Sequence, residues 1–152
     1  ISGHAGVLVG VANVANTIIA FGAEYHFPIA SLTIDAGFTY FSVIAEDTEE
    51  LGLAYSLTSI DPGATYHLDL GSSFSIDVGA RLSYAMLSVI LETTTDSQEY
   101  KANATGIMPT VGATLKFGAI GLGLDIRKPI YNGEDYKDLG GIYVLGRAHL
   151  FF

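Results

Sequence analysis

Apolar residues alternate with small or polar residues along nearly the whole chain. This two-residue period is typical of β-strands with one apolar and one polar face. Eight segments carry it: 3–12, 17–27, 32–43, 57–68, 74–89, 106–117, 119–130 and 141–152. The pattern therefore predicts an all-β fold of eight strands.

The links between these segments are of two kinds. The tight turns are 28–31, 69–73 and the turn at Gly118, and the long, acidic links are 45–56, 93–105 and 131–140. The link at 13–16 is short but falls on the side of the long links. Tight turns at one end and long loops at the other are typical of an antiparallel up-and-down barrel.

Residue types indicate which face of each strand points inward. In the segment 74–89 one face carries Phe74, Ile76, Val78, Ala80, Leu82, Tyr84 and Met86, and the other carries Ser75, Asp77, Gly79, Arg81 and Ser83. A soluble barrel would have an outer face rich in Lys and Glu, whereas this polar face is mostly small residues with isolated charges. The interior of an eight-stranded barrel is just wide enough for side chains, so glycines would make room beside each arginine. The pattern predicts a polar lumen and an apolar exterior.

Charged residues on the polar face form the predicted lumen charge network. Its members are Glu24, Asp35, Asp61, Asp77, Arg81, Lys116, Asp125, Arg127 and Arg147. Charges removed from water persist when they are paired and hydrogen-bonded, so we expect ion pairs that plug the lumen. The alternative interpretation is an ion path or gate, which would make the protein a small channel or transporter.

Composition points to a membrane protein without a transmembrane helix. Hydrophobic residues make up 49% of the 152 residues, charged residues only 15%, and the mean hydropathy is +0.40. The apolar runs are far shorter than the roughly 20 residues that a membrane-spanning helix needs. We therefore predict a single transmembrane β-barrel domain over residues 1–152. The absence of cysteine excludes disulfides and thiolate sites.

Acidic residues give the chain a net charge of −9. Nine of its sixteen acidic residues fall in the long links, and a tenth, Glu92, lies directly before the link 93–105. The densest group is Glu46, Asp47, Glu49 and Glu50. These acidic loops are either merely solvated, or they gather divalent cations that bridge lipopolysaccharide phosphates, or they meet a basic partner. The charge and the lack of a basic stripe argue against nucleic acid.

The whole pattern resembles the OmpA-type family of small eight-stranded outer-membrane β-barrel proteins. The resemblance covers the full chain as architecture, and no motif assigns a subfamily. Its most specific element is the last segment, in which alternating apolar positions include Leu150 and end at Phe152. This segment looks like the C-terminal signal that the outer-membrane assembly machinery reads. The resemblance implies the outer membrane of a Gram-negative bacterium, with membrane lipid and lipopolysaccharide as neighbours.

Four histidines form the most interesting polar set. His4, His26, His67 and His149 all fall on the predicted lumen face near the tight turns. Neutral imidazoles at that spacing could bind a transition metal or act as a proton-binding cluster. The alternative is simple pairing with Glu24, Asp35 or Asp69.

Catalysis is not predicted. The chain has no phosphate-binding loop, dinucleotide fingerprint, zinc-protease motif or nucleophile elbow, and no cofactor is expected. Small barrels include enzymes that act on lipid A, but inward histidines near the tight turns would not reach lipid in the outer leaflet. We predict a non-enzymatic membrane anchor that displays acidic loops at the cell surface for a structural, adhesive or interaction role. A soluble lipocalin-like carrier is a further alternative.

Overall fold

The computed structural model describes residues 4–13, 17–47, 51–133 and 141–152. Its strands are β1 (His4–Asn13), β2 (Thr17–Ile29), β3 (Leu32–Asp47), β4 (Leu51–Ile60), β5 (Gly63–Asp69), β6 (Phe74–Thr93), β7 (Ser97–Phe117), β8 (Ile120–Arg127), β9 (Ile130–Tyr131) and β10 (Ile142–Phe151). A helix with the length and apolar character to cross a membrane does not occur in the described part of the chain.

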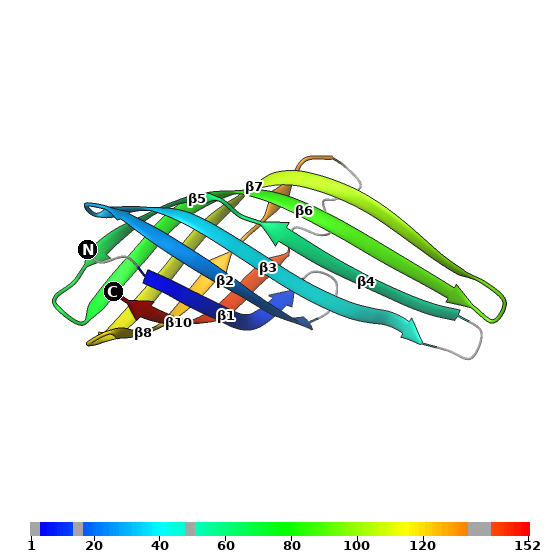
Figure 1. Ribbon diagram of the computed structural model, residues 1–152, viewed down its shortest axis with the longest axis horizontal. Helices are drawn as coiled ribbons and strands as arrows, with labels where there is room; N and C mark the ends of the chain where they lie inside the picture. The colour runs from blue at the N-terminus through cyan, green and yellow to red at the C-terminus, as the bar shows by residue number, and fades with distance from the viewer. Residues whose placement is uncertain (1–3, 14–16, 48–50, 134–140) are drawn as a thin grey trace.

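The strands close into an antiparallel barrel (Figure 1). The first and last strands meet along their full length, with His4 opposite Phe151 at one end and Asn13 opposite Ile142 at the other. β4 and β5 share one position in the wall, as do β8 and β9, so the ten strands make an eight-stranded barrel. The predicted all-β, eight-stranded, up-and-down fold is confirmed.

Prolines explain the two interruptions in the wall. Pro62 separates β4 from β5 and Pro129 separates β8 from β9, because proline has no N–H to donate to a strand ladder. The wall still continues across the first break. Gly37 and Asp61 exchange two backbone hydrogen bonds of 3.2 and 2.8 Å, and Leu82 N donates to Pro62 O at 2.8 Å.

Four strands are much longer than the sequence pattern predicts. The β3–β4 ladder runs on to the pair Asp47 and Gly52, and the β6–β7 ladder to the pair Glu92 and Ser97. The predicted loops 45–56 and 93–105 are therefore wrong, because residues 45–47, 51–56 and 97–105 belong to strands, with Glu46, Asp47 and Glu99 among them. In contrast, β2 pairs with β3 only as far as Phe41.

These extensions form a protruding sheet, defined here as residues 42–47 of β3, 51–58 of β4, 86–93 of β6 and 97–105 of β7. It extends past the other strands at one end of the barrel (Figure 1). We call this the protruding end, and the opposite end, with the turns at 30–31, 70–73 and 118–119, the turn end. Gly118, with φ of 63°, occupies one of these turns. Of the third predicted loop, residues 134–140 lie outside the described residues.

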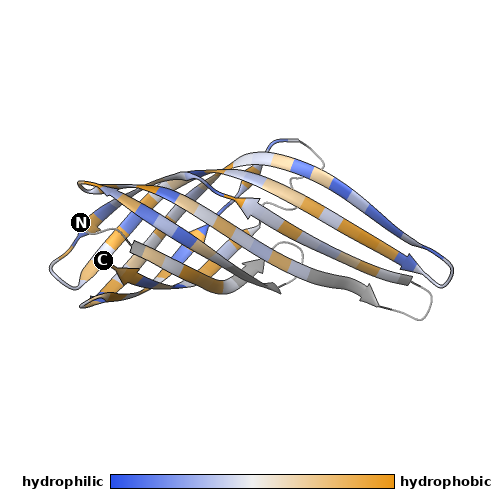
Figure 2. Cartoon of the chain, in the orientation of Figure 1, coloured by the Kyte–Doolittle hydropathy of each residue, from blue (hydrophilic) through white to orange (hydrophobic). Residues whose placement is uncertain are grey.

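Alternating burial confirms the predicted orientation of the two faces, and hydropathy alternates along the strands in Figure 2. On β8, Leu122 and Leu124 are each 52% exposed on the outer surface, whereas Arg127 is fully buried in the lumen. The aromatic residues Phe27, Tyr66 and Phe117 are also exposed on the outer surface. The exterior is thus an apolar band suited to hydrocarbon.

The lumen has two parts with different chemistry. Its turn-end part holds the buried charges. Its other part, toward the protruding end, is filled by an apolar cluster of Leu8, Phe41, Leu57, Ala85, Ala104, Tyr131, Tyr143 and Leu145. Phe41 and Tyr143 meet edge to face with ring centroids 6.1 Å apart. The lumen is therefore polar only in part, because large apolar residues occupy inward positions near the protruding end.

Candidate functional site

The buried polar network begins on β2, where Glu24 and His26 point to the same side because residues two apart on a strand share a face. β1 pairs with both β2 and β10, and this arrangement brings His149 of β10 across to the same region. Asp35 lies opposite His26 in the β2–β3 register. Barrel closure thus assembles residues far apart in sequence.

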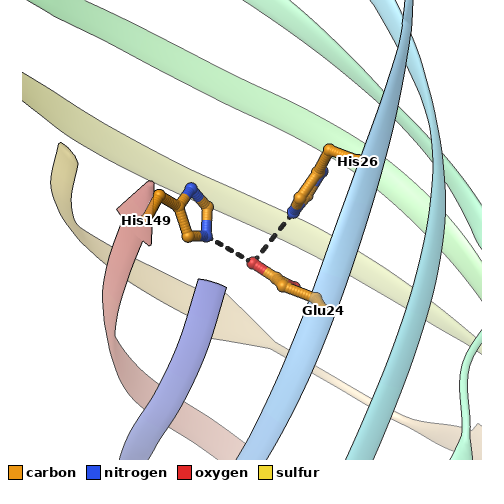
Figure 3. Close-up of side chains that lie close together, drawn as sticks. All are labelled: Glu24, His26 and His149. Atoms are coloured by element: carbon orange, nitrogen blue, oxygen red, sulfur yellow. Dashed lines mark hydrogen bonds and ion pairs between the residues drawn. The ribbon is translucent and has the colours of Figure 1, made fainter. Parts of the chain in front are cut away.

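Glu24 lies at the centre of the network and is 4% exposed. Its Oε1 lies 3.0 Å from His26 Nε2 and 2.9 Å from His149 Nε2 (Figure 3). Its Oε2 accepts hydrogen bonds from Arg81 Nη2 at 3.0 Å and Arg127 Nη2 at 2.7 Å. One oxygen of the carboxylate therefore contacts two imidazoles, and the other contacts two guanidinium groups.

His26 is held between two carboxylates. Its Nδ1 lies 2.6 Å from Asp35 Oδ1, while its Nε2 faces Glu24. A ring with a carboxylate at each nitrogen has the arrangement of a doubly protonated imidazole. Asp35 is fixed in turn by the hydroxyls of Thr33, at 2.8 Å, and Thr65.

Asp125 and Asp77 extend the network along the lumen. Asp125 pairs with Arg127 at 2.6 Å and with Arg147 at 3.3 Å. Arg147 also pairs with Asp77, which lies 2.7 Å from His67 Nδ1. Seven of the nine predicted lumen charges thus form one connected ladder from Glu24 to His67.

Two predicted network members lie outside this ladder. Asp61 accepts hydrogen bonds from three hydroxyls, those of Ser59 at 2.9 Å, Thr39 at 3.2 Å and Ser83 at 2.7 Å. Lys116 is half-buried at the turn end and pairs with Asp69 at 2.9 Å. The placement of Lys116 in the buried network is therefore wrong, because its long side chain reaches the barrel mouth instead.

The buried charges do not balance by themselves. Among the described residues, five carboxylates and three guanidinium groups are buried in the lumen: Glu24, Asp35, Asp61, Asp77, Asp125, Arg81, Arg127 and Arg147. This leaves an excess of two negative charges before the histidines are counted. Buried charge is costly unless it is compensated, so two protonated imidazoles or one divalent cation would restore neutrality.

Glycines make room for the arginines, as the sequence suggests. A Cβ on Gly112 would overlap Asp125 Oδ1 and lie 3.0 Å from Arg147 Nη2. A Cβ on Gly37 would lie 2.7 Å from Arg81 Nη1. The small residues on the polar face are therefore needed by the long side chains beside them.

A small cavity lies at the turn end of the network, with a volume of about 20 Å³. Its lining includes His67, Asp77, His149, Thr114 and Lys116. This volume is sufficient for one water molecule.

Hydroxyl groups are the part of the network that sequence reasoning missed. Thr114 Oγ1 donates to Asp77 at 2.9 Å, and Thr33 lies 3.0 Å from His67 Nε2. The available signal was position, because these residues fall on the polar face of their strands. They supply the extra hydrogen bonds that buried carboxylates need.

The protruding sheet changes the polarity of the strands that build it. On its outer face, β6 and β7 carry the polar residues Ser88, Glu92, Glu99, Lys101 and Asn103, with Met86 and Ile90 among them. The inner face carries Leu87, Val89, Leu91 and Ala102, together with Gln98 and Tyr100. Leu87 packs against the apolar cluster of the lumen. The outer surface of the same strands thus changes from apolar to polar along their length.

A small polar cluster occupies this outer face. Ser88 Oγ donates to Glu99 Oε1 at 2.9 Å, and Lys101 Nζ lies 3.3 Å from the same oxygen. The Ser88 hydroxyl, followed by the Lys101 ammonium, lowers the pKa of Glu99 below its usual value. The side chains of Glu99 and Lys101 are exposed, and Ser88 is half-buried.

Several predicted residues can be placed only in part. Glu46 and Asp47 belong to the end of β3 rather than to a loop, and Glu49 and Glu50 lie outside the described residues. His4 lies opposite His26 in the β1–β2 register, and its side chain lies outside the described part.

The C-terminal residues have clear positions. Leu150 is 56% exposed on the outer face of β10, and Phe152 follows the end of that strand. The ring of Phe152 lies 6.2 Å from that of Tyr25. Both apolar C-terminal side chains therefore face the exterior at the turn end.

Comparison with known proteins shows the fold. Neisserial surface protein A has a TM-score of 0.73 at 17% identity, over 99% of this chain and 96% of that one. Ail of Yersinia pestis, solved with the heparin analogue sucrose octasulfate, has a TM-score of 0.65 at 11% identity, over 99% and 97%. The outer-membrane enzyme PagL has a TM-score of 0.51 at 18% identity, over 99% and 100%. No family model and no curated protein sequence matches the chain.

By fold, the chain is a small eight-stranded barrel of the bacterial outer-membrane type. The predicted architecture is confirmed at this level. The structural neighbours include both a protein solved with a polyanion and an enzyme, so the shared fold does not select a function.

Proposed function

We propose that this protein is a non-enzymatic membrane anchor that holds the protruding sheet at the cell surface as a binding platform for a basic partner. The observation that carries the proposal is the reversal of polarity along β6 and β7. A strand whose outer face changes from Leu82 to Ser88 and Glu92 leaves hydrocarbon and enters water. The sheet beyond that point is accessible to molecules outside the membrane.

Charge indicates the kind of partner. The sequence segments 42–58 and 86–105 contain seven acidic residues and one lysine: Glu46, Asp47, Glu49, Glu50, Glu92, Asp96, Glu99 and Lys101. A field of one sign attracts ligands of the opposite sign and repels like charge. A polyanion of the kind bound to Ail would therefore be disfavoured here, and a basic peptide or protein surface favoured.

The buried histidines support a role other than catalysis. His26, His67 and His149 are all buried inside the lumen, so none of these imidazoles lies on the lipid-facing surface where a lipid substrate would be. Chemistry on lipid requires a base within hydrogen-bond distance of the substrate. The filled lumen likewise supports an anchor rather than a small channel.

The other proposed partners follow from the exterior. The apolar band would contact outer-membrane lipid, including lipopolysaccharide in the outer leaflet. Leu150 and Phe152, exposed at the turn end, would be read by the assembly machinery during insertion.

Binding of a fluorescent octalysine peptide to the barrel in zwitterionic nanodiscs tests the proposal. The triple variant Glu92→Gln, Asp96→Asn, Glu99→Gln should bind the peptide at least about threefold more weakly, since each exposed charge pair contributes about 0.2–1 kcal/mol. The affinity should also fall as salt is added.

Asp69→Asn is the matched control, because it removes an exposed acid at the turn end. It should leave the affinity unchanged. Equal weakening by Asp69→Asn and the triple variant would contradict the proposal, as would tighter binding of sucrose octasulfate than of octalysine.

A further inference from the structure

The Glu24 region has the features of a metal site, and this inference is independent of the proposed surface function. We propose that Glu24, His26 and His149 bind one divalent transition metal ion, of which Zn²⁺ is the natural example, inside the turn-end half of the barrel.

Ligand geometry is the first support. Glu24 Oε1, His26 Nε2 and His149 Nε2 converge, with all three atoms within 4.8 Å of one another. Both nitrogens lie about 3 Å from Oε1 (Figure 3). Tetrahedral zinc, with metal–ligand distances of about 2.1 Å, places its ligand atoms about 3.4 Å apart. Both Oε1–nitrogen distances are therefore within a few tenths of an ångström of the separation that a tetrahedral site requires.

The donor set selects the class of metal. Two imidazole nitrogens and one carboxylate oxygen suit zinc and similar transition metals, whereas calcium and magnesium prefer all-oxygen sites. Three protein ligands also leave one position for water. His149 also lines the small cavity at the turn end, which has room for one water molecule beside that ligand.

The surrounding groups orient the ligands as they do in known metal sites. His26 Nδ1 lies 2.6 Å from Asp35, so the carboxylate fixes the ring with Nε2 directed at the metal position. Glu24 Oε2 is occupied by Arg81 and Arg127. These bonds hold the carboxylate still and leave Oε1 for the ion.

The net charge of the surrounding groups determines whether a cation can bind near the two arginines. Arg81 and Arg127 repel it, but the connected ladder carries one more carboxylate than guanidinium groups, and Asp61 adds a further buried carboxylate outside the ladder. A divalent ion would offset this buried negative charge.

His67 lies near the site but is not a member of it. Its ring centroid lies 6.3 Å from that of His26, and its Nδ1 faces Asp77. It therefore provides a control variant of the same residue type in the same lumen.

Calorimetric titration of the folded full chain in detergent micelles with Zn²⁺ tests the site. We expect one ion per chain with micromolar or tighter affinity. His149→Gln and Glu24→Gln should weaken binding at least 100-fold. Asp35→Asn should weaken it about 10- to 100-fold, and His67→Gln less than twofold.

Folding of each variant is checked by its mobility on a gel with and without boiling. X-ray absorption is also measured on the unaltered protein, so that the test does not depend on the folding of the variants. X-ray absorption of the zinc complex should show two imidazole ligands. Absence of saturable binding below about 100 µM, a spectrum without imidazole ligands, or an equal loss from His67→Gln would overturn the proposal.

Discussion

The same strands build two regions with different outer faces. One is the apolar band around the barrel, called the belt below, and the other is the protruding sheet, whose outer face is mostly polar. In the belt, Leu82 of β6 faces outward and Arg81 faces the lumen. In the protruding sheet, Ser88 faces outward and Leu87 faces inward. The β6–β7 ladder runs without a shift of register from the pair Phe74 and Leu115 to the pair Glu92 and Ser97.

The difference teaches that the medium outside a strand, rather than its pairing, decides which residues it presents. Hydrocarbon selects an apolar outer face and makes the enclosed polar groups pair with one another. Water selects a polar outer face and leaves apolar residues to cover the apolar cluster. Substitutions of one type should therefore have different effects in the two regions.

The largest difference is expected for charge removal. Arg127→Met leaves Glu24 and Asp125 without their shared partner in a fully buried site, which should lower the free energy of unfolding by about 3–5 kcal/mol. Lys101→Met removes an exposed lysine from the protruding sheet and should leave stability unchanged. Urea unfolding in micelles measures both, and comparable losses would contradict the comparison.

Charge addition on the outer face should give the next largest effect. Leu122→Arg places a cation against hydrocarbon and should cost about 2–4 kcal/mol if the site lies near the bilayer centre. Asn103→Arg, on the outer face of the protruding sheet, should change stability by less than about 0.5 kcal/mol. Folding titrations into lipid vesicles provide the measurement. A large cost at Asn103 would place that position in lipid.

Replacing glycine by alanine should lower stability in the crowded lumen but not in the open sheet. A Cβ at Gly112 would overlap Asp125 and approach Leu124 O to 2.7 Å, so Gly112→Ala should destabilise by about 1–3 kcal/mol. A Cβ at Gly52 in β4 meets nothing closer than 3.4 Å. Gly52→Ala should therefore be neutral or slightly stabilising in urea unfolding, and equal losses at both positions would refute the crowding argument.

The smallest effect concerns the exposed carboxylate. Ser88→Ala removes the main cause of the lowered pKa of Glu99, so that pKa should rise toward its usual value. A lowered folded-state pKa gives stability that is present above the unfolded pKa and lost as the pH falls through the folded pKa. The variant should weaken that acid dependence. Carboxyl NMR titration of Glu99 measures the shift, and an unchanged pKa would show that the Ser88 bond does not form.

The barrel could be predicted from the sequence because its signal is local. Alternation along each segment and the chemistry of residues such as Gly79 and Arg81 indicate strands, faces and lumen without any knowledge of contacts. The protruding sheet was mistaken for loops because its outward residues, such as Glu99 and Lys101, are charged. The two-residue period continues through them with its polarity reversed.

The candidate site could be predicted only in outline. Parity places His26 and His149 in the lumen, but the position of Glu24 between them depends on barrel closure through β1. For Lys116, the face of the strand was predicted correctly, but its side chain extends to Asp69 at the mouth of the barrel. Side-chain reach and closure geometry are not encoded in a local pattern.

The polarity reversal on β6 can be measured directly with single spin labels, because the chain has no native cysteine. Labels at Val78, Leu82, Ser88 and Glu92 sample one outer face from belt to tip. We expect accessibility to dissolved oxygen at Val78 and Leu82, and accessibility to a water-soluble nickel reagent at Ser88 and Glu92. Nickel accessibility at Val78 and Leu82, or oxygen accessibility without nickel at Glu92, would contradict the account.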